Sequence, residues 1–203
     1  MVTIFQDFSL DDATCASMFT DRKRLFVDLL DWDVPVLDGR FEIDAYDGPS
    51  ATYLVATDED GHHIGSMRLL PTEGPHILGD LFAGLCHDPV PRGACIFEIT
   101  RLCLPTRLGA AQRLAVRNRL ISAMVDHAHD HGIVAFTGVV SESFRSQVLA
   151  MGWRCAALGV PQPVAAQRLG AFRIDLDAGT RAALTLIGIY TPDTRRSPAR
   201  QAA

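Results

Sequence analysis

Two charged residues interrupt an apolar stretch near the middle of the chain. Residues 95–104 read CIFEITRLCL, in which Glu98 and Arg101 lie three positions apart among hydrophobic side chains. Burying an unpaired carboxylate costs several kcal/mol, so Glu98 needs a partner or a chemical role. In a straight strand Glu98 and Thr100 share one face and Arg101 points to the other, so the two charges do not neutralise each other. A zwitterionic ligand would recruit both signs.

Further polar residues lie beside aromatic residues in the N-terminal half. They are Arg22, Phe26 and Trp32, then Asp44 and Asp47 in EIDAYD, and Arg68 in GSMRLLP. Most of them also have an ordinary structural explanation. Arg22 belongs to the charge run DRKR, which is typical of a solvated helix face, and the aspartates precede a Gly-Pro turn. Trp32 is typical of a core anchor, and an arginine at a strand end is typically exposed. Glu98 is the hardest to explain in this way.

Apolar spacing predicts the elements that position these residues. Residues 11–30 repeat apolar side chains at helical spacing, which predicts an amphipathic helix. Residues 31–50 are rich in Pro, Gly and Asp, which predicts a long surface loop. Residues 51–57 and 63–71 predict two strands joined by a turn, and residues 94–104 predict a third strand.

The second half of the chain alternates helices and strands. After Pro105, residues 109–132 predict a long helix that ends at Gly132. A strand (133–140), a short helix that begins at Ser141 (141–152) and two further strands (153–158 and 171–177) follow. This order predicts an α/β fold with a mixed, mostly antiparallel central sheet flanked by helices on both faces. It resembles the N-acyltransferase (GNAT-like) fold, and this analogy assigns no chemistry.

Composition indicates a single globular domain. The chain has 203 residues, of which 48% are hydrophobic and 21% charged, and we expect one domain over residues 1–191 and a disordered tail over 192–203. The sequence has no apolar run long enough to cross a membrane and no secretory signal pattern at its start, so a soluble cytoplasmic protein is expected. The five cysteines show no metal-binding spacing, which favours reduced, mostly buried thiols.

The charge distribution shows one basic region on an acidic chain. The net charge of −5 argues against a dedicated nucleic-acid-binding protein. Residues 99–125 contain no acidic side chain but five arginines, which is typical of a solvated helix face or of a docking site for an acidic partner. His127 and His131 lie one helical turn apart, a spacing that can bind metal. A solvated polar face at the helix end is the interpretation that we prefer, and no metal site is expected.

Five of these motifs together resemble those of one protein family. Arg22, Phe26 and Trp32 follow the pattern R-x3-F-x5-W, and EIDAYD, GSMRLLP, GDLF and FEITR come after it in order. MGWR at 151–154 also fits. From about residue 15 to residue 155, the order and spacing of these motifs resemble those of acyl-homoserine-lactone synthases, the autoinducer synthase family.

The resemblance implies an enzyme that makes an N-acyl-L-homoserine lactone, a quorum-sensing signal, from S-adenosyl-L-methionine and an acyl thioester. The amine of adenosylmethionine attacks the thioester carbonyl to give an amide. Its carboxylate then displaces methylthioadenosine and closes the lactone. Adenosylmethionine would be a substrate, so no cofactor is expected. The other partner would be an acyl carrier protein carrying an acyl chain, or an acyl-CoA, and no nucleic acid or membrane is implied.

The resemblance also implies roles for individual residues. Glu98 would be the general base, acting through a water molecule. Adenosylmethionine would be bound by Arg22, Phe26, Trp32, Asp44, Asp47, Arg68, Phe82 and Arg101. Aspartates suit its cationic end, arginines suit its carboxylate, and aromatic faces suit its sulfonium. Some of the charged residues would instead brace one another as ion pairs.

The acyl group and its carrier would contact the second half of the chain. The expected acyl pocket consists of Ile99, Thr100, Leu102, Met124, Val139, Val140, Leu149 and Trp153. Family members that prefer 3-oxo chains tend to have a threonine at about the position of Val139. Valine there predicts a preference for acyl groups without the 3-oxo function. Thr137 or Ser141 is the alternative residue whose hydroxyl would meet the oxo group. The expected docking face for an acidic carrier protein consists of Arg113, Arg117, Arg145 and Arg154.

Two other functions remain open from the sequence. An acyl-CoA-dependent N-acetyltransferase normally has R/Q-x-x-G-x-G/A at a helix start, where backbone amides bind the pyrophosphate of coenzyme A. This chain has TRLGAAQ at 106–112, in which Arg107 precedes Gly109 by two positions rather than three. An inactive binding relative would lack Glu98 or the paired aspartates, which are all present.

Overall fold

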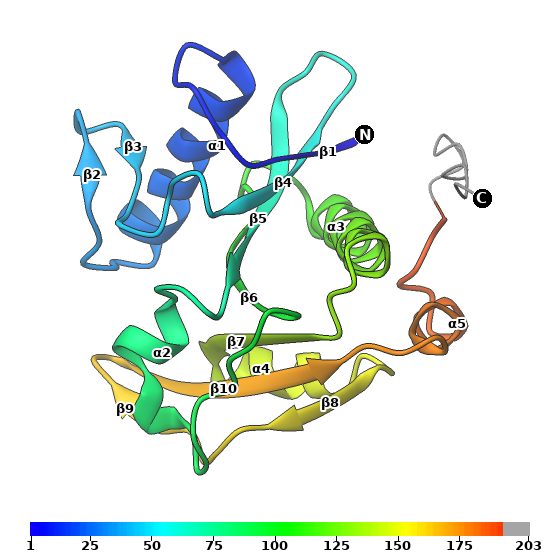
Figure 1. The fold of residues 1–203 in the computed structure, drawn as a ribbon. Coiled ribbons are helices and arrows are strands. Elements are labelled where there is room, and N and C mark those ends of the chain that lie inside the picture. Colours follow the sequence, from blue (N-terminus) through cyan, green and yellow to red (C-terminus); the bar gives the residue numbers. More distant parts are fainter. Residues whose placement is uncertain (193–203) are drawn as a thin grey trace.

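The computed structural model describes residues 1–192, so the predicted disordered tail lies outside the described residues except for its first position. One large sheet runs through the molecule, and a separate pair of short strands lies beside it (Figure 1). The large sheet contains β1 (Val2–Phe5), β4 (Thr52–Thr57), β5 (His63–Pro71), β6 (Ile96–Cys103), β7 (Ala135–Ser141), β8 (Arg154–Ala157), β9 (Gln162–Val164) and β10 (Gln167–Asp175). The separate pair is β2 (Val36–Leu37) with β3 (Phe41–Glu42).

The strand order confirms the predicted sheet class. The order is β1-β4-β5-β6-β7-β10-β8, with β9 also paired to β10. All these pairs are antiparallel except β6 with β7, which are parallel. The parallel pair needs a crossover, and the long helix predicted after Pro105 provides it.

Helices cover both faces of the sheet. They are α1 (Ala13–Arg22), the π-helix η1 (Lys23–Leu29), α2 (Ile77–Leu81), the 3₁₀ turn η2 (Ala83–Leu85), α3 (Ala110–Asp130), α4 (Glu142–Leu149) and α5 (Thr180–Leu186). Residues of α1 and α2 pack against one face and residues of α3, α4 and α5 against the other. In β4, Leu54 and Ala56 face the α3 side whereas Tyr53 and Val55 face the α1 side, as the two-residue period of a strand requires.

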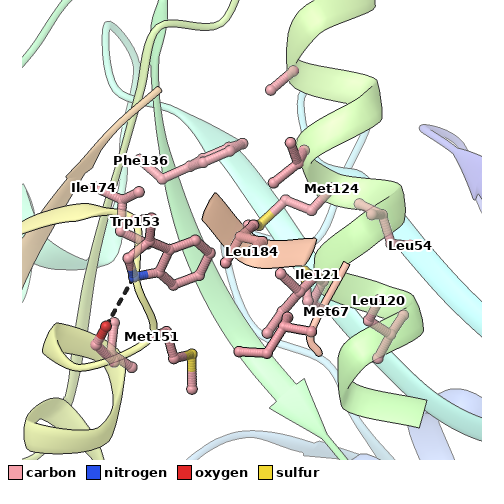
Figure 2. Close-up of a cluster of buried hydrophobic side chains, with 14 of the residues drawn as sticks. Leu54, Met67, Leu120, Ile121, Met124, Phe136, Met151, Trp153, Ile174 and Leu184 are labelled. Carbon is pink, nitrogen blue, oxygen red and sulfur yellow. Dashed lines mark hydrogen bonds between the residues drawn. The ribbon is translucent and has the colours of Figure 1, made fainter. Parts of the chain in front are cut away.

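The largest hydrophobic core lies between the sheet and α3 (Figure 2). Leu120 and Met124 of α3 are buried there against Leu54 of β4 and Met67 of β5. Trp153 packs into the same cluster, and its indole N–H donates to the carbonyl oxygen of Val148 at 2.8 Å. The core thus fixes the strands from one side, and the charged residues noted above project from the other side.

Local signals explain where several elements begin and end. Asp12 caps α1 by accepting from the backbone N–H of Cys15, and Ser141 caps α4 by accepting from that of Phe144. Gly132, with a φ of 67°, follows α3 as predicted. The helix predicted over residues 11–30 extends over residues 13–29 in the structure, as α1 to Arg22 and then as the π-helix η1. The predicted loop over 31–50 contains the β2–β3 pair.

Strands β6 and β7 pair over only part of their length. Ile96, Phe97 and Glu98 pair with residues 135–137, and beyond these positions the two strands continue without being paired to each other. Glu98 is the last residue of β6 that pairs with β7. The pairing between β6 and β7 therefore ends at Glu98 and Thr137.

Within residues 1–192, no helix combines the length and apolar character that crossing a membrane requires. The same residues contain five free cysteines, but only Cys15 and Cys103 are buried, and Cys95 is exposed. The prediction of mostly buried thiols is therefore only partly correct.

Candidate active site

Strand β6 contains a β-bulge at Arg101. The pairing between β5 and β6 changes register there, so that Met67 of β5 lies opposite two residues of β6, Arg101 and Leu102. Arg101 adopts a φ of 51°, a left-handed conformation that residues with a side chain rarely adopt. Bulges re-aim side chains and occur frequently next to active sites.

The bulge brings Arg101 to the same side of the sheet as its neighbours. Arg68 of β5 donates to Thr100 Oγ1 at 3.0 Å and to Asp44, and Arg101 donates to the same Asp44 carboxylate. The expectation that Arg101 points away from Glu98 and Thr100 is therefore wrong, because it assumed a straight strand. The physical reason is the extra residue in β6.

Glu98 is fully buried, and its two carboxylate oxygens have different surroundings. Oε1 accepts a hydrogen bond from the backbone N–H of Leu78, in the first turn of α2, at 2.8 Å. Oε2 has no hydrogen-bond partner within residues 1–192. Burial raises the pKa of Glu98 to about 7, although the backbone N–H groups of Leu78 and Ile77 act to lower it. A carboxylate with a pKa near neutrality and one unpartnered oxygen is suited to accept a proton.

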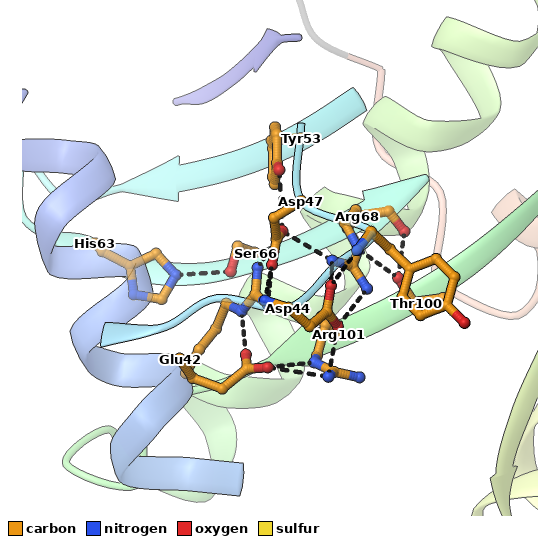
Figure 3. Close-up of polar contacts among 11 residues, drawn as sticks. Glu42, Asp44, Asp47, Tyr53, His63, Ser66, Arg68, Thr100 and Arg101 are labelled. Atoms are coloured by element: carbon orange, nitrogen blue, oxygen red, sulfur yellow. Dashed lines mark hydrogen bonds and ion pairs between the residues drawn. The ribbon is translucent and has the colours of Figure 1, made fainter. Parts of the chain in front are cut away.

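A buried ion network lies on the same side of the sheet (Figure 3). We define the ion network as Arg22, Glu42, Asp44, Asp47, Arg68 and Arg101. Arg22 donates to both oxygens of Asp47 at 2.9 Å each, and its Nε lies 2.6 Å from Glu42 Oε2. These contacts with Arg22 hold the pKa of Asp47 well below its usual range, although burial alone would raise it.

The other half of the ion network joins β5 and β6 to the segment after β3. Arg68 donates to the two oxygens of Asp44 at 2.6 and 3.0 Å, and lies 2.8 Å from Asp47 Oδ1. Arg101 bridges Glu42 Oε1 at 2.9 Å and Asp44 Oδ2 at 2.7 Å. Three guanidinium groups meet three carboxylates, so the ion network is neutral without a ligand.

Exposure divides the ion network into inner and outer members. The side chains of Arg22, Glu42, Asp47 and Arg68 are at most 1% exposed, whereas those of Asp44 and Arg101 are each 8% exposed. Each of the four inner side chains already has a carboxylate or guanidinium partner within the ion network. Only Asp44 and Arg101 lie where a substrate would reach them from outside.

Two aromatic residues stack beside the outer edge of the ion network. The rings of Phe26 and Trp32 are 4.7 Å apart and nearly parallel, and the Arg101 guanidinium carbon lies 5.5 and 5.6 Å from their centres. Phe26 belongs to η1, and π-helical segments are frequent at functional sites. Phe82 is half-buried and packs against the residues of α2 that hold Glu98. Of the aromatic residues expected for adenosylmethionine, Phe26 and Trp32 thus lie beside Arg101, and Phe82 lies beside the residues of α2 that contact Glu98.

Two members of this site were missed in the sequence. Glu42 accepts from two arginines, and Tyr53 donates to Asp47 Oδ1 at 2.9 Å. Glu42 lies two residues before Asp44, and this spacing would place both on one face if the segment were extended. The Pro-, Gly- and Asp-rich composition of residues 31–50 predicts an irregular loop instead, and this masks the signal.

A second buried polar cluster adjoins the ion network. Asp21 Oδ2 lies 2.7 Å from His63 Nδ1, and His63 Nε2 lies 3.0 Å from Ser66 Oγ. These are the residue types of a hydrolase triad, but all three are at most 3% exposed, so no substrate reaches the serine. Arg107 donates to Asp21 and to the backbone oxygen of His63. The arginine of the incomplete acetyltransferase motif is therefore occupied within the protein.

The expected acyl-pocket residues fall on two faces of the sheet. Met124 and Trp153 belong to the main core, with Ile99, Leu102 and Val140 packed against it. Val139 instead packs against Leu78 and Ala171 on the Glu98 side, and Thr100 is bonded to Arg68. Leu149 is only half-buried at the end of α4. The structure therefore does not bring the eight residues together in one cluster.

The expected docking arginines also differ in their surroundings. Arg113 and Arg117 are half-buried on α3, and Arg154 is 75% exposed. Arg145 is buried and donates to the backbone oxygens of Gly159 and Ala171 at 2.8 and 3.4 Å. Assigning Arg145 to an exposed docking face is therefore wrong, because its guanidinium holds α4 to the sheet.

Neither a cluster of carboxylate and imidazole groups on the surface nor a cavity beside β1 coincides with this site. Asp58, Asp60 and His62 place donor atoms close together in an exposed turn, where Asp58 caps the backbone of the other two. A cavity of about 1080 Å³ lies between β1 and α3 and is lined by Phe97 among others. It includes neither Glu98 nor any residue of the ion network. The candidate active site is therefore defined by its residues and not by this cavity.

Comparisons with known proteins agree with this interpretation. A family model described as autoinducer synthase matches residues 7–184. An acyl-homoserine-lactone synthase of Ralstonia nicotianae is 33% identical over 186 residues, which cover 88% of this chain and 90% of the relative.

Solved structures share the fold. The crystal structure of TofI in a ternary complex with an inhibitor and MTA is 29% identical, with a TM-score of 0.76 over 91% of this chain and 96% of that one. BjaI, a CoA-dependent acyl-homoserine lactone synthase solved with SAM and isopentyl-CoA, has a TM-score of 0.82 over 97% and 95% of the chains, and at 22% identity it shows the fold alone. A putative N-acetyltransferase from Lactobacillus plantarum (TM-score 0.57, 15% identity, 86% and 99% of the chains) also agrees with the expected fold. The family model over residues 7–184 and the relative at 33% identity show that this chain belongs to the autoinducer synthase family of acyl-homoserine-lactone synthases.

Proposed function

We propose that the protein makes an N-acyl-L-homoserine lactone from S-adenosyl-L-methionine and an acyl thioester, with Glu98 as general base. The observation that carries the assignment of Glu98 is its unpartnered Oε2 in a buried site where the pairing between β6 and β7 ends. We also propose that the reaction takes place in the cytoplasm and that residues 1–191 form one domain. The continuous sheet from β1 to β10 supports the single domain.

In the first step, the amine nitrogen of adenosylmethionine bonds to the thioester carbonyl carbon, and the carbon–sulfur bond breaks. The thiolate leaves with the electron pair of that bond, and Glu98 takes the proton released by the nitrogen. In the second step, the carboxylate of the same substrate bonds to its γ-carbon, and the sulfonium leaves as methylthioadenosine. Holding both reacting groups in one site lowers the barrier by avoiding a bimolecular encounter.

Adenosylmethionine would bind at the outer edge of the ion network. Arg101 offers its guanidinium to the substrate carboxylate, and Asp44 offers its carboxylate to a cationic group. The stacked rings of Phe26 and Trp32 would shelter the substrate from water. The inner members, such as Arg22 and Asp47, would act by holding Arg101 and Asp44 in place.

Mass spectrometry of the culture medium tests the proposed function. The protein is expressed in a bacterial host that makes no such signal, and the medium is searched for the homoserine-lactone fragment. We expect a product that carries this fragment, and its mass identifies the acyl group. Absence of the product across several acyl supplements, from a folded protein, would contradict the assignment.

Charge reversal on α3 tests whether an acyl carrier protein is the donor. Arg113 and Arg117 are four residues apart and therefore share one side of the helix. The double variant Arg113→Glu, Arg117→Glu is expected to raise the KM for an acyl carrier protein by about tenfold, and high salt should have a similar effect on the parent. Arg168→Glu is a useful control, because its side chain is 52% exposed but lies on β10, outside the expected docking face. Equal activity with an acyl-CoA, insensitive to both changes, would instead favour coenzyme A as the donor.

Substitution at Val139 tests the acyl preference. Val139 lies two residues beyond Thr137 on β7 and packs on the Glu98 side of the sheet, near the reacting end of the acyl group. Valine offers no hydrogen bond to a 3-oxo oxygen, which costs about 1 to 3 kcal/mol. Val139→Thr is therefore expected to raise kcat/KM for 3-oxo donors about fivefold or more relative to unsubstituted donors. A parent product profile dominated by 3-oxo lactones would contradict this interpretation.

A further inference from the structure

Three buried side-chain atoms in residues 1–192 have no hydrogen-bond partner: Glu98 Oε2, Thr137 Oγ1 and His76 Nε2. His76 lies at the N-terminus of α2, where its Nδ1 contacts the backbone oxygen of Gly74 and its ring lies against Gly79. Glu98 and Thr137 are on two adjacent strands. Thr137 was named above as a substitute for Val139 in contacting a 3-oxo oxygen, but it has no role in the two chemical steps.

Glu98 and Thr137 lie side by side on one face of the sheet. They are the last matched pair of the parallel strands β6 and β7, and matched residues of such strands point to the same side. The preceding pair, Phe97 and Phe136, belongs to the main core on the opposite face. Since Glu98 Oε2 and Thr137 Oγ1 are each without a partner, they are also not bonded to each other.

An unpartnered hydroxyl in this position is unfavourable for folding. Thr137 is fully buried, and a buried hydroxyl without a hydrogen bond destabilises the folded state. Valine has the same shape without that cost. The hydroxyl is therefore expected to have a partner that comes from outside the protein, and the adjacent Glu98 Oε2 would share it.

A small group that carries N–H or O–H hydrogens satisfies both atoms at once. The carboxylate accepts one hydrogen, and the hydroxyl accepts another or donates to a lone pair. In the proposed reaction, two groups of this kind pass through the site: the attacking amine and the water that carries its proton. Both lie on the path between the amine nitrogen and Glu98.

We propose that Thr137 is a second residue of the proton-transfer site, where its hydroxyl and Glu98 together fix the water that carries the proton of the attacking amine. This inference rests on the proposed function of Glu98. The amine loses one proton to the water, the water gives one proton to Glu98 Oε2, and the nitrogen lone pair forms the amide bond. Thr137 keeps its own proton and acts only by orientation.

Two threonine-to-valine substitutions test this proposal. Thr137→Val is expected to lower kcat about tenfold or more, with an unchanged KM for adenosylmethionine and a melting temperature equal to or above that of the parent. Thr72→Val is the matched control, because Thr72 is also fully buried but donates to the backbone oxygen of Ile96 at 2.8 Å and accepts from Gly93 N–H at 3.1 Å. That variant is expected to melt earlier and to retain the kcat of the parent.

The conservative variant and the parent complete the test. Thr137→Ser keeps the hydroxyl and is expected to recover most of kcat. If Thr137→Val retains the kcat of the parent, or loses kcat only in proportion to a lower melting temperature, the proposal is overturned. If the parent makes lactone and Thr137→Val is fully active, only this inference is contradicted. If the parent makes no lactone, the proposed function is contradicted.

Discussion

Glu98→Gln is expected to lower kcat by about 10²-fold or more, while the KM for adenosylmethionine changes less than about threefold. Glutamine keeps an oxygen that accepts from the Leu78 N–H, so α2 remains held to β6. It offers no oxygen that binds a proton at the position of Oε2. The loss is therefore confined to proton removal, which steady-state kinetics with both substrates will separate from binding.

The pH dependence of the parent gives a second measurement on the same residue. Glu98 must be ionised to accept a proton, and burial raises its pKa to about 7. The kcat of the parent is therefore expected to rise as the pH rises from about 6 to 8. Glu98→Gln is expected to lose this ionisation from its pH profile.

Stability should change in the opposite direction to activity. The pKa of Glu98 is raised from 4.5 to about 7, so the folded state binds more protons than the unfolded state between these values. The parent is therefore expected to lose up to about 3 kcal/mol of stability from this group as the pH rises through that window. Relative to the parent, Glu98→Gln is expected to be more stable at pH 8 than at pH 4.

A matched control separates this effect from a general effect of replacing a glutamate. Glu142 is 47% exposed and pairs with Arg168 at 2.8 Å, so Glu142→Gln is expected to leave kcat and its pH profile unchanged. If Glu98→Gln keeps a kcat within a few-fold of the parent, Glu98 has a structural role, in which its carboxylate caps α2.

Regular elements were predictable where one periodic pattern extends over many residues. The strands β4, β5 and β6 have the expected positions because their apolar residues bury one or both faces, and α3 runs to the expected glycine. The same patterns are too short in β2 and β3, with two residues each, and in α2, with five. Local propensity cannot specify such elements, because contacts with distant residues stabilise them.

The arrangement of the site depended on backbone features that the sequence pattern does not encode. Residues that the family resemblance assigns to adenosylmethionine, such as Arg22, Asp44 and Arg68, do come together. However, the pairing of Arg22 with Glu42 and the bulge at Arg101 depend on how β3 meets β6. Strict alternation of side chains between the two faces of the sheet along β6 therefore predicts the wrong face for Arg101. The burial of Arg145 was equally unpredictable, because its partners are backbone oxygens of β10 and the preceding loop.

Asp47→Ala is expected to destabilise the protein by about 3 to 5 kcal/mol, as is typical when one partner of a buried ion pair is removed. Asp47 is fully buried, and its oxygens accept from Arg22, from Tyr53 and from the backbone N–H of Asp44. Its removal leaves the Arg22 guanidinium with Glu42 as its remaining carboxylate partner. The contacts therefore predict that Asp47→Ala destabilises the folded state itself rather than only weakening adenosylmethionine binding.

Thermal and denaturant unfolding measure the effect, with a surface pair as the control. A loss of 3 to 5 kcal/mol corresponds to a melting temperature lower by about 10 °C in a domain of this size. Asp28 forms an ion pair with Lys23 at 2.7 Å, but its side chain is 47% exposed. Asp28→Ala is therefore expected to change the stability by less than about 1 kcal/mol.

Comparison with Arg101→Ala shows whether the ion network has distinct inner and outer members. Arg101 lies at the outer edge beside Phe26 and Trp32, so its removal is expected to raise the KM for adenosylmethionine about tenfold or more, beyond any loss of stability. At low temperature, the Asp47→Ala protein that remains folded is expected to bind adenosylmethionine with an affinity closer to that of the parent than Arg101→Ala does. If instead Asp47→Ala melts like the parent and fails to bind adenosylmethionine, Asp47 contacts the substrate directly, and the inner members of the ion network belong to the binding surface.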